Sequence, residues 1–468
     1  MQSTASKAQD GVTLFRRYLW WHYYYFAGLS HWMARRITRV GWFMLLSCGL
    51  LLMVTVDPEA SISYQGGILL TLILMVSPWL TLGSRARFEA ERTLPRFASV
   101  GAEMVYQVRV KNLGKRPQRG VYVMEDLPDP RPSVRDFSLI PEPGEEKRNF
   151  WDRRYLYYRW SWLLGQSVRA KAEEGVCDDV PAEGETTVTL RLCPTRRGKM
   201  RLTRLSFGCP DPLGLFRSLI GVSCPAEVMV LPRRYPVSSL ALPGSRKYQP
   251  GGVTLAGQVG ESEEFVALRD YRPGDPLKKI HWRSTARCGR PIVKEFVDEF
   301  FVRHGLILDT FTNEPFNGAF EEAVSVAASF ACTVRDRDSL LDLLVVGPVA
   351  FTFTTGRGVG QDEKMLEILA GVQPCPDRSF KDLADLVMSQ ETELSGCLCV
   401  LLDWDEERQN FVRRLRQRLV PVKVIVMRPV GADDSLDAGV MGDLPGDFHV
   451  IPAEETKARL ATIKPAHR

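Results

Sequence analysis

The clearest candidates for a binding surface in this sequence are basic side chains that recur at helical spacing. Lys279, Arg283 and Arg287 recur every fourth residue, so on a helix they would form one charged stripe. Clustered guanidinium groups pair well with carboxylates, which favours contact with an acidic surface. The alternative is that the stripe is the solvated face of a surface helix, which is the usual role of an isolated basic stripe.

The residues just before the stripe predict how it is positioned. Pro273-Gly274 suits the central positions of a type II turn, because proline presets one φ and glycine accepts the positive φ that follows. We expect Asp275 to cap a helix whose first turn contains Pro276 and which ends near Arg287.

Two aspartates form a second candidate site. Asp309 ends the apolar run 301–309, and Asp403 ends the apolar run 397–403. If both runs are parallel strands, the two carboxylates lie at the carboxyl edge of one sheet, where such folds bind ligands. Their oxygens suit Mg²⁺ or acid–base chemistry, whereas capping of the local loops is the more ordinary role.

Several classes of protein are disfavoured by the sequence. It contains no GxSxG, HExxH or P-loop pattern, so we expect no enzymatic activity, and any use of ATP must come from a partner. The net charge of +5 does not indicate nucleic acid binding. The ten cysteines include no CxxC pair, which predicts reduced thiols and neither a disulfide framework nor a zinc site.

The N-terminal residues have the composition of a membrane anchor. Runs 41–56 and 66–82 carry no charge, the linker 57–65 is acidic, and arginines flank the pair. This pattern predicts a two-helix transmembrane hairpin at 41–84 with both ends in the cytoplasm. Residues 1–40 are rich in aromatic and basic side chains, and we expect an interfacial helix there, with a third span as the alternative.

Short alternating segments follow and predict a β-sandwich over residues 85–236. The expected strands cover residues 105–111, 186–192, 200–207 and 226–231. Residues 131–185 interrupt this pattern with many aromatic and arginine residues. They are expected to form either an inserted helical element that packs on the protein or a second contact with lipid.

Strands and helices alternate over most of residues 237–468. Apolar runs at 301–309, 340–347, 349–355, 397–403 and 420–427 are expected to be strands, and helices are expected at 317–335, 361–371, 380–388 and 405–419. This alternation predicts a doubly wound α/β domain with a parallel sheet and helices on both faces. The fold class is therefore that of a membrane-anchored multidomain protein.

Three segments of the sequence resemble a known family. They are RDYRPGDPLKKIHWRSTARCGR (269–290), PTRRGK (194–199) and DPLGLF (211–216). They are similar to the domain-of-unknown-function family 58, over an expected 85–300, with only an outline match in the C-terminal part. Members of that family are membrane-tethered bacterial proteins usually linked to MoxR-type AAA+ ATPases.

The resemblance implies a non-enzymatic adaptor at the bacterial inner membrane, with its soluble domains in the cytoplasm. The implied partners are a MoxR-type ATPase, other von Willebrand factor A-type proteins and membrane lipid, without nucleic acid. The residues expected to contact the partner are Arg269, Arg272, Asp275, Lys279, Trp282, Arg283 and Arg287. The alternatives are a metal-dependent ligand-binding domain and a membrane-associated hydrolase.

The order of the C-terminal elements resembles a von Willebrand factor A domain, in which Asp-x-Ser-x-Ser, a threonine and a further aspartate often hold Mg²⁺. Asp309 and Asp403 match the two aspartates, but Phe311 and Asn313 occupy the hydroxyl positions, and Ser379 is the one candidate for the threonine. We therefore expect no cofactor, with a degenerate Mg²⁺ site at Asp309 and Asp403 as the alternative.

Overall fold

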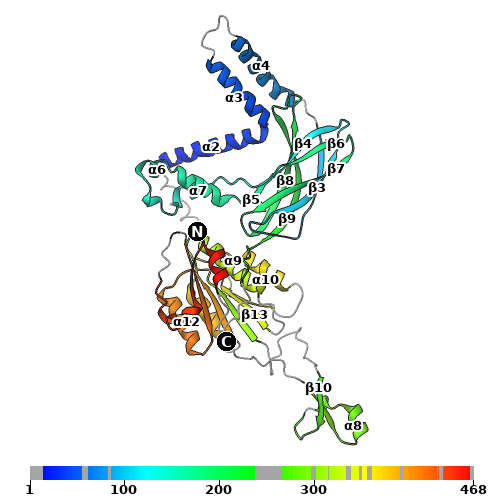
Figure 1. Cartoon of the computed structure of the whole chain (residues 1–468), viewed down its shortest axis with the longest axis vertical. Helices are drawn as coiled ribbons and strands as arrows, with labels where there is room; N and C mark the ends of the chain where they lie inside the picture. The colour runs from blue at the N-terminus through cyan, green and yellow to red at the C-terminus, as the bar shows by residue number, and fades with distance from the viewer. Residues whose placement is uncertain are drawn as a thin grey trace, which may run out of the picture. The chain divides into compact units, whose positions relative to one another are not determined.

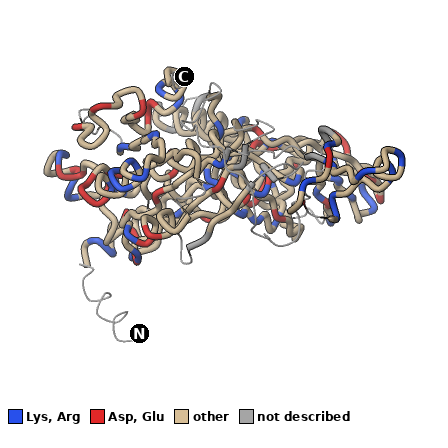
Figure 2. Tube along the Cα trace, turned by 90° about the horizontal axis from the view of Figure 1, so that it is seen from below, with Lys and Arg blue, Asp and Glu red and all other residues tan. Residues whose placement is uncertain are grey.

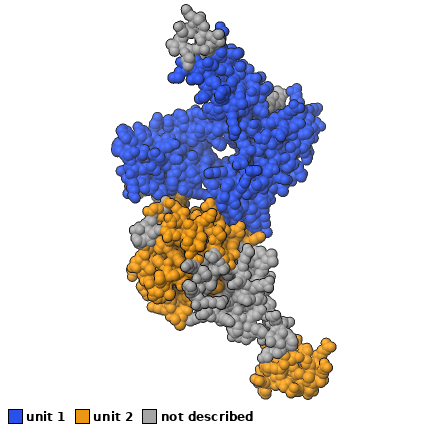
Figure 3. All heavy atoms as spheres, viewed as in Figure 1, with its two compact units in different colours: residues 1–232 blue, residues 233–468 orange. Residues whose placement is uncertain are grey.

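The computed structural model divides into two compact units, Met1–Pro232 and Arg233–Arg468 (Figure 3). The residues that it describes are 14–54, 62–82, 86–237, 265–275, 277–296, 302–314, 316–333, 339–346, 350–355, 361–390, 394–429, 431 and 436–463. Basic and acidic residues both occur along much of the trace (Figure 2), and their sum is the small net charge of +5.

The first unit begins with three helices, α2 (Leu14–Arg36), α3 (Arg39–Val54) and α4 (Ile62–Leu82) (Figure 1). Helices α3 and α4 pack together, with Cys48 Sγ 3.3 Å from Thr71 Oγ1. Among the described residues, one segment, Tyr64–Thr81, is long and apolar enough to cross a membrane, whereas the apolar part of α3, Arg39–Leu51, is shorter. The structure thus supports one candidate span where the sequence predicted two. Residues 55–61, 83 and 84 of the expected hairpin lie outside the described residues.

Helix α2 has two different faces. On one face, Trp20 Nε1 donates a hydrogen bond to the carbonyl oxygen of Pro132 at 2.9 Å, and Tyr23 makes ring contacts with Phe137 and Trp160. The other face is exposed and carries Leu14, Tyr18, Trp21, Tyr25 and Trp32. We call this exposed set the aromatic stripe of α2.

The partners of α2 belong to the predicted insertion. It forms α5 (Val134–Leu139), the 3₁₀ helix η1 (Glu145–Lys147), α6 (Phe150–Tyr155) and α7 (Tyr157–Ser167). This segment therefore packs on α2. The insertion ends before 185, because β5 (Ala170–Ala172) and β6 (Gly175–Val180) already belong to the sheets that follow.

Two sheets enclose the core of the first unit. One has the order β1-β3-β7-β5, with β1 (Phe88–Thr93), β3 (Met104–Asn112) and β7 (Glu185–Pro194). The other has the order β2-β9-β8-β4-β6, with β2 (Phe97–Ser99), β4 (Gln118–Asp126), β8 (Gly198–Pro210) and β9 (Arg217–Leu231). As the alternation predicted, Tyr106, Val108 and Val110 point inward into a core shared by both sheets. This arrangement is a β-sandwich.

The loop between β8 and β9 fixes the start of α3. Asp211 Oδ1 accepts hydrogen bonds from the backbone N–H groups of Leu215 and Phe216 at 2.7 and 3.1 Å, and Oδ2 accepts from the hydroxyl of Ser77 in α4. Thr38 donates to the carbonyl oxygens of this loop from its backbone N–H and its hydroxyl. The loop 211–216 therefore attaches the apolar helices α3 and α4 to the sandwich.

The second unit contains a two-stranded hairpin of β10 (Phe265–Asp270) and β11 (Ile292–Phe296). The chain between these strands forms the 3₁₀ helix η2 (Leu277–Lys279) and α8 (Trp282–Cys288). The two strands are antiparallel, with Asp270 opposite Ile292. The segment 269–290, one of the three that resemble the family, therefore forms the tip of this hairpin.

A six-stranded sheet forms the body of the second unit, in the order β14-β13-β12-β15-β16-β17. Its strands are β12 (Val302–Leu308), β13 (Ser339–Val346), β14 (Ala350–Thr355), β15 (Gly396–Leu401), β16 (Val422–Arg428) and β17 (Phe448–Pro452). Helices α9 (Gly318–Thr333), α10 (Gln361–Gly371), α11 (Phe380–Gln390), α12 (Glu406–Gln417) and α13 (Thr456–Thr462) surround it.

The sheet differs from the predicted one in two respects. Strand β14 is antiparallel to β13, because the connection between them is too short for a parallel crossover. Strand β17 and helix α13 were not predicted. The remaining strand pairs are parallel, and helices α11 and α12 bury their apolar residues against one face of the sheet.

Candidate functional site

Asp275 organises the turn at the tip of the hairpin. Its Oδ2 accepts a hydrogen bond from the backbone N–H of Arg272 at 2.8 Å, and the guanidinium of Arg269 donates to both carboxylate oxygens at 2.7 and 2.8 Å. The hydrogen bonds from Arg269 and Arg272 lower the pKa of Asp275 to about 2. Gly274 has the predicted positive φ of 106°. Arg269 and Asp275, both predicted to contact a partner, are thus bonded to each other within the turn.

The helix expected up to Arg287 is interrupted at residues 280 and 281. Ile280 forms an isolated bridge with Val293, and the backbone N–H of His281 donates to the carbonyl oxygen of Ile292 at 2.8 Å. These contacts with β11 replace helical hydrogen bonds and leave Lys279 in η2, apart from the helix that carries Arg283 and Arg287. The prediction of one continuous stripe and of a helix capped by Asp275 was wrong, and Pro276 lies outside the described residues.

The outer side of α8 and η2 combines apolar and basic side chains. Leu277 and Trp282 are 67% and 68% exposed, although large apolar side chains are usually buried. Arg283 and Arg287 are exposed as well, and no ion pair joins either of them to another described residue. We call these four residues the hairpin surface.

The hairpin surface is held in place by contacts beneath it. Thr285 Oγ1 accepts a hydrogen bond from the backbone N–H of Ile292 at 3.0 Å, which joins α8 to β11. Gly289 ends α8 in the left-handed conformation with a φ of 66°. The exposed side chains therefore project from a fixed backbone.

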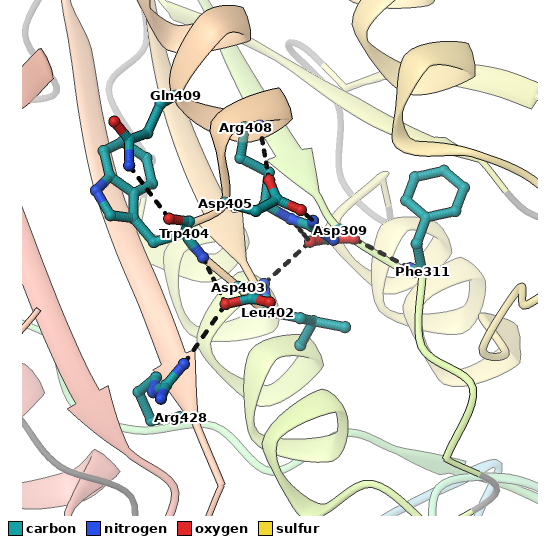
Figure 4. A network of polar contacts seen from close by, with 9 residues as sticks. All are labelled: Asp309, Phe311, Leu402, Asp403, Trp404, Asp405, Arg408, Gln409 and Arg428. Atoms are coloured by element: carbon teal, nitrogen blue, oxygen red, sulfur yellow. Dashed lines mark hydrogen bonds and ion pairs between the residues drawn. The ribbon is translucent and has the colours of Figure 1, made fainter. Parts of the chain in front are cut away.

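At the carboxyl edge of the six-stranded sheet, Asp309 is completely buried (Figure 4). Its Oδ1 accepts a hydrogen bond from the backbone N–H of Phe311 at 3.0 Å. Its Oδ2 accepts from the backbone N–H of Leu402 at 3.0 Å and from Arg408 Nε at 2.8 Å. Both carboxylate oxygens are thus already bonded to donors of the protein.

Arg408, in the first turn of α12, supplies the positive charge beside Asp309. Its Nη1 also donates to Asp405 Oδ2 at 2.6 Å, and its guanidinium carbon lies 4.8 Å from the centroid of the Phe380 ring. Burial lowers the pKa of Arg408, but the charge and hydrogen bond of Asp309, with the charges of Asp405 and Asp403, together raise it by more. The group is therefore charged whenever the domain is folded.

Asp403 lies at the same edge, as predicted, but in a different environment. It is 58% exposed at its side chain, accepts a hydrogen bond from the backbone N–H of Trp404 at 2.8 Å and lies 3.5 Å from Arg428 Nη1 (Figure 4). The two carboxylates thus have separate cationic partners, Arg408 and Arg428.

These residues do not fit a Mg²⁺ site. The hydroxyl of Thr310 donates to the carbonyl oxygen of Val346 at 2.5 Å, and Ser379 is an exposed residue before α11. Within the described parts of the chain, no group of three or more histidine, cysteine, aspartate or glutamate side chains could hold a metal ion. A cation at Asp309 would have to displace Arg408.

Sequence reasoning did not identify Arg408. Four arginines occur on α12, at positions 408, 413, 414 and 416, and three of them lie on its outer or partly exposed sides. The available signal was the spacing from Asp405, the N-cap, to a basic residue in the first turn, where helices usually favour acids. A cation at that position indicates a partner with negative charge.

Comparisons with known proteins agree with the motif. Residues 267–435 match the family model described as "Protein of unknown function DUF58". The predicted resemblance to that family is confirmed. The match covers the hairpin and most of the six-stranded sheet, whereas we had expected it over 85–300.

One relative is "Uncharacterized protein YeaD" from Bacillus subtilis (strain 168), which is 26% identical over 186 residues, or 39% of this chain and 45% of that protein. The matched region therefore spans less than half of the relative's length. Among solved structures, the CARDB domain of the PF1109 protein from Pyrococcus furiosus matches 31% of this chain and 89% of its own, with a TM-score of 0.17 and 13% identity.

Proposed function

We propose that this chain is a membrane-anchored adaptor whose cytoplasmic domains bind a MoxR-type AAA+ ATPase during the assembly or maturation of protein complexes. The observation that carries the proposal is the hairpin surface. It combines exposed Leu277 and Trp282 with Arg283 and Arg287, neither of which forms an ion pair with another described residue. The adaptor is non-enzymatic and takes no cofactor.

The hairpin surface has the chemistry of a protein contact. Tryptophan and arginine are the residues that most often dominate binding energy at interfaces, because the first buries a large apolar area and the second pairs with carboxylates. The backbone beneath the hairpin surface is fixed by Thr285 and Asp275, so binding costs little ordering of the chain. An acidic patch with an apolar centre is the complementary partner.

The anchor is the apolar pair α3 and α4, with α2 in the membrane interface. Figure 1 shows that α2 does not continue the direction of α3 but turns away from it. Its aromatic stripe would be costly in water, whereas indole and phenol rings favour the headgroup region. Arginines before α3 and after α4 favour the cytoplasm for both soluble units.

The second unit is a von Willebrand factor A-like domain in this proposal, with Arg408 in place of the metal-dependent site. The pairing of Asp309 with Arg408 favours the adaptor over the metal-dependent alternative, because the required carboxylate is already neutralised.

Binding of the full chain in detergent to a purified MoxR-type ATPase tests the proposal. Arg283→Glu with Arg287→Glu reverses two charges on the hairpin surface and should weaken binding by at least about tenfold. Lys364→Glu with Lys457→Glu, two exposed positions on α10 and α13, makes the same change in net charge and should leave binding intact. Equal binding by both double variants would refute the assignment of the hairpin surface.

A further inference from the structure

A pocket of about 240 Å³ opens at the carboxyl edge beside Arg408. Its wall includes Phe311, Thr312 and Asn313 after β12, Arg378 and Phe380 at the start of α11, and Arg408 on α12. It is smaller than the pockets that hold drug-sized ligands, so it suits a short side chain or a small organic acid.

One nitrogen of Arg408 has no acceptor among the residues that the structure describes. The side chain is 8% exposed, Nε is bonded to Asp309, and Nη1 is bonded to Asp405. Over the described ranges of the chain, Nη2 has no acceptor, although Arg408 lines the pocket. A guanidinium nitrogen that faces the pocket without an acceptor is an available donor, and an oxyanion that enters the pocket would accept from it.

The rest of the wall also favours a negative group. Thr312 Oγ1 accepts hydrogen bonds from the backbone N–H of Glu314 and from Asn317 Nδ2, so its proton is left to donate to a ligand. Helices α11 and α12 both begin at this pocket, and the amino end of a helix carries partial positive charge. Glu407, which also lines the pocket, is exposed, so its carboxylate can remain in water.

The aromatic residues determine which oxyanion fits. The rings of Phe311 and Phe380 lie edge to face, 6.0 Å apart, and Phe380 also supports the guanidinium of Arg408. They provide an apolar wall for a hydrocarbon chain that ends in a carboxylate, whereas inorganic phosphate would leave that wall exposed to water.

We propose that this pocket binds the carboxylate of an acidic side chain or a small organic acid directly through Arg408, without a metal ion. The guanidinium then lies between the carboxylates of Asp309 and of the ligand, as a divalent cation does in a metal-dependent site. This contact is separate from the hairpin surface and does not depend on the adaptor role.

Calorimetric titration of the full chain in detergent with EDTA tests the inference. Glutarate represents the free acid, an acidic peptide represents the side chain, and phosphate is the comparison ligand. Arg408→Lys keeps the charge beside Asp309 and removes Nη2. Thr312→Val removes the hydroxyl and leaves the ion pair of Asp309 and Arg408 in place. Arg414→Gln, on the exposed side of α12, is the control.

Saturable binding of glutarate or of the peptide, weakened on the order of tenfold in Arg408→Lys and in Thr312→Val but not in Arg414→Gln, supports the site. Binding of the peptide alone assigns the ligand to a protein side chain. Absence of binding for both carboxylates, tighter binding of phosphate, or binding that appears only with added Mg²⁺ overturns it. Equal affinity of wild type and Thr312→Val also overturns it, even if Arg408→Lys fails to fold.

Discussion

Arg408 Nε lies 2.8 Å from Asp309 Oδ2, and the two side chains are 8% and 0% exposed. Removal of one partner from such a buried pair leaves an uncompensated charge, which costs about 3–5 kcal/mol. We therefore predict that Arg408→Met strongly destabilises the six-stranded sheet near β15 and α12. Hydrogen exchange measured by mass spectrometry over residues 396–417 should show faster exchange than in the wild type.

The double variant Asp309→Asn with Arg408→Met tests whether the uncompensated charge of Asp309 causes this destabilisation. It removes both charges, so exchange over the same residues should be slower than in Arg408→Met alone. If the double variant is destabilised by the sum of the two single effects, the pair is not coupled as described.

The lowered pKa of Asp275 predicts how the tip of the hairpin responds to acid. Its pKa falls from 3.8 to about 2 in the folded state, so the unfolded chain takes up the proton first as pH falls. The stabilisation from Arg269 and Arg272 is therefore complete above pH 3.8 and is lost as pH falls toward 2. An NMR titration of the Asp275 carboxyl carbon, assigned with Asp275→Asn, should have its midpoint well below 3.8, whereas an ordinary midpoint would exclude the tight ion pair.

Gly41 in α3 lies against the loop 211–216, and a methyl group there would overlap the carbonyl oxygen of Leu215. Gly49 in the same helix has nothing within 4 Å of the corresponding position. We predict that Gly41→Ala loosens the attachment of α3 to the sandwich at a cost of about 1–3 kcal/mol, while Gly49→Ala does not. Limited proteolysis of the full chain between β8 and β9 reports the difference, and similar cleavage of the two variants would show that the attachment is not tight.

The aromatic stripe of α2 predicts an orientation in the membrane. A fluorescent unnatural amino acid at Tyr18, Trp21 or Tyr25 should report one shared depth near the headgroups when the full chain is in vesicles with brominated lipids. A spanning helix would instead separate the first and last positions by about 10 Å in depth, since each residue adds about 1.5 Å. Such a gradient of quenching is incompatible with an in-plane helix.

Much of the fold could be predicted because burial imposes a period on the sequence. The alternation around Tyr106, Val108 and Val110 predicted β3, and the apolar runs of the second unit predicted β12, β13, β15 and β16 close to their observed limits. Strand β17 was missed because Phe448–Pro452 is short and includes His449, so its apolar content is weak.

The sites were harder to predict, because they depend on contacts between distant residues. Spacing placed Lys279 on the same stripe as Arg283, but the bridge between Ile280 and Val293 breaks the helix between them. Asp309 was correctly placed at the carboxyl edge, whereas its partner Arg408 lies 99 positions away. No local pattern shows which of the basic residues on α12 is buried.

Photo-crosslinking at Trp282 tests the central claim most directly. A benzophenone amino acid at position 282 of the full chain, mixed with the purified MoxR-type ATPase, should give an adduct that maps to an acidic surface of the ATPase. The same amino acid at Leu419, an exposed apolar position after α12, should give none. An adduct at 419 without one at 282, or no adduct at 282 under conditions where the two proteins bind, would contradict the assignment of the hairpin surface as the partner contact.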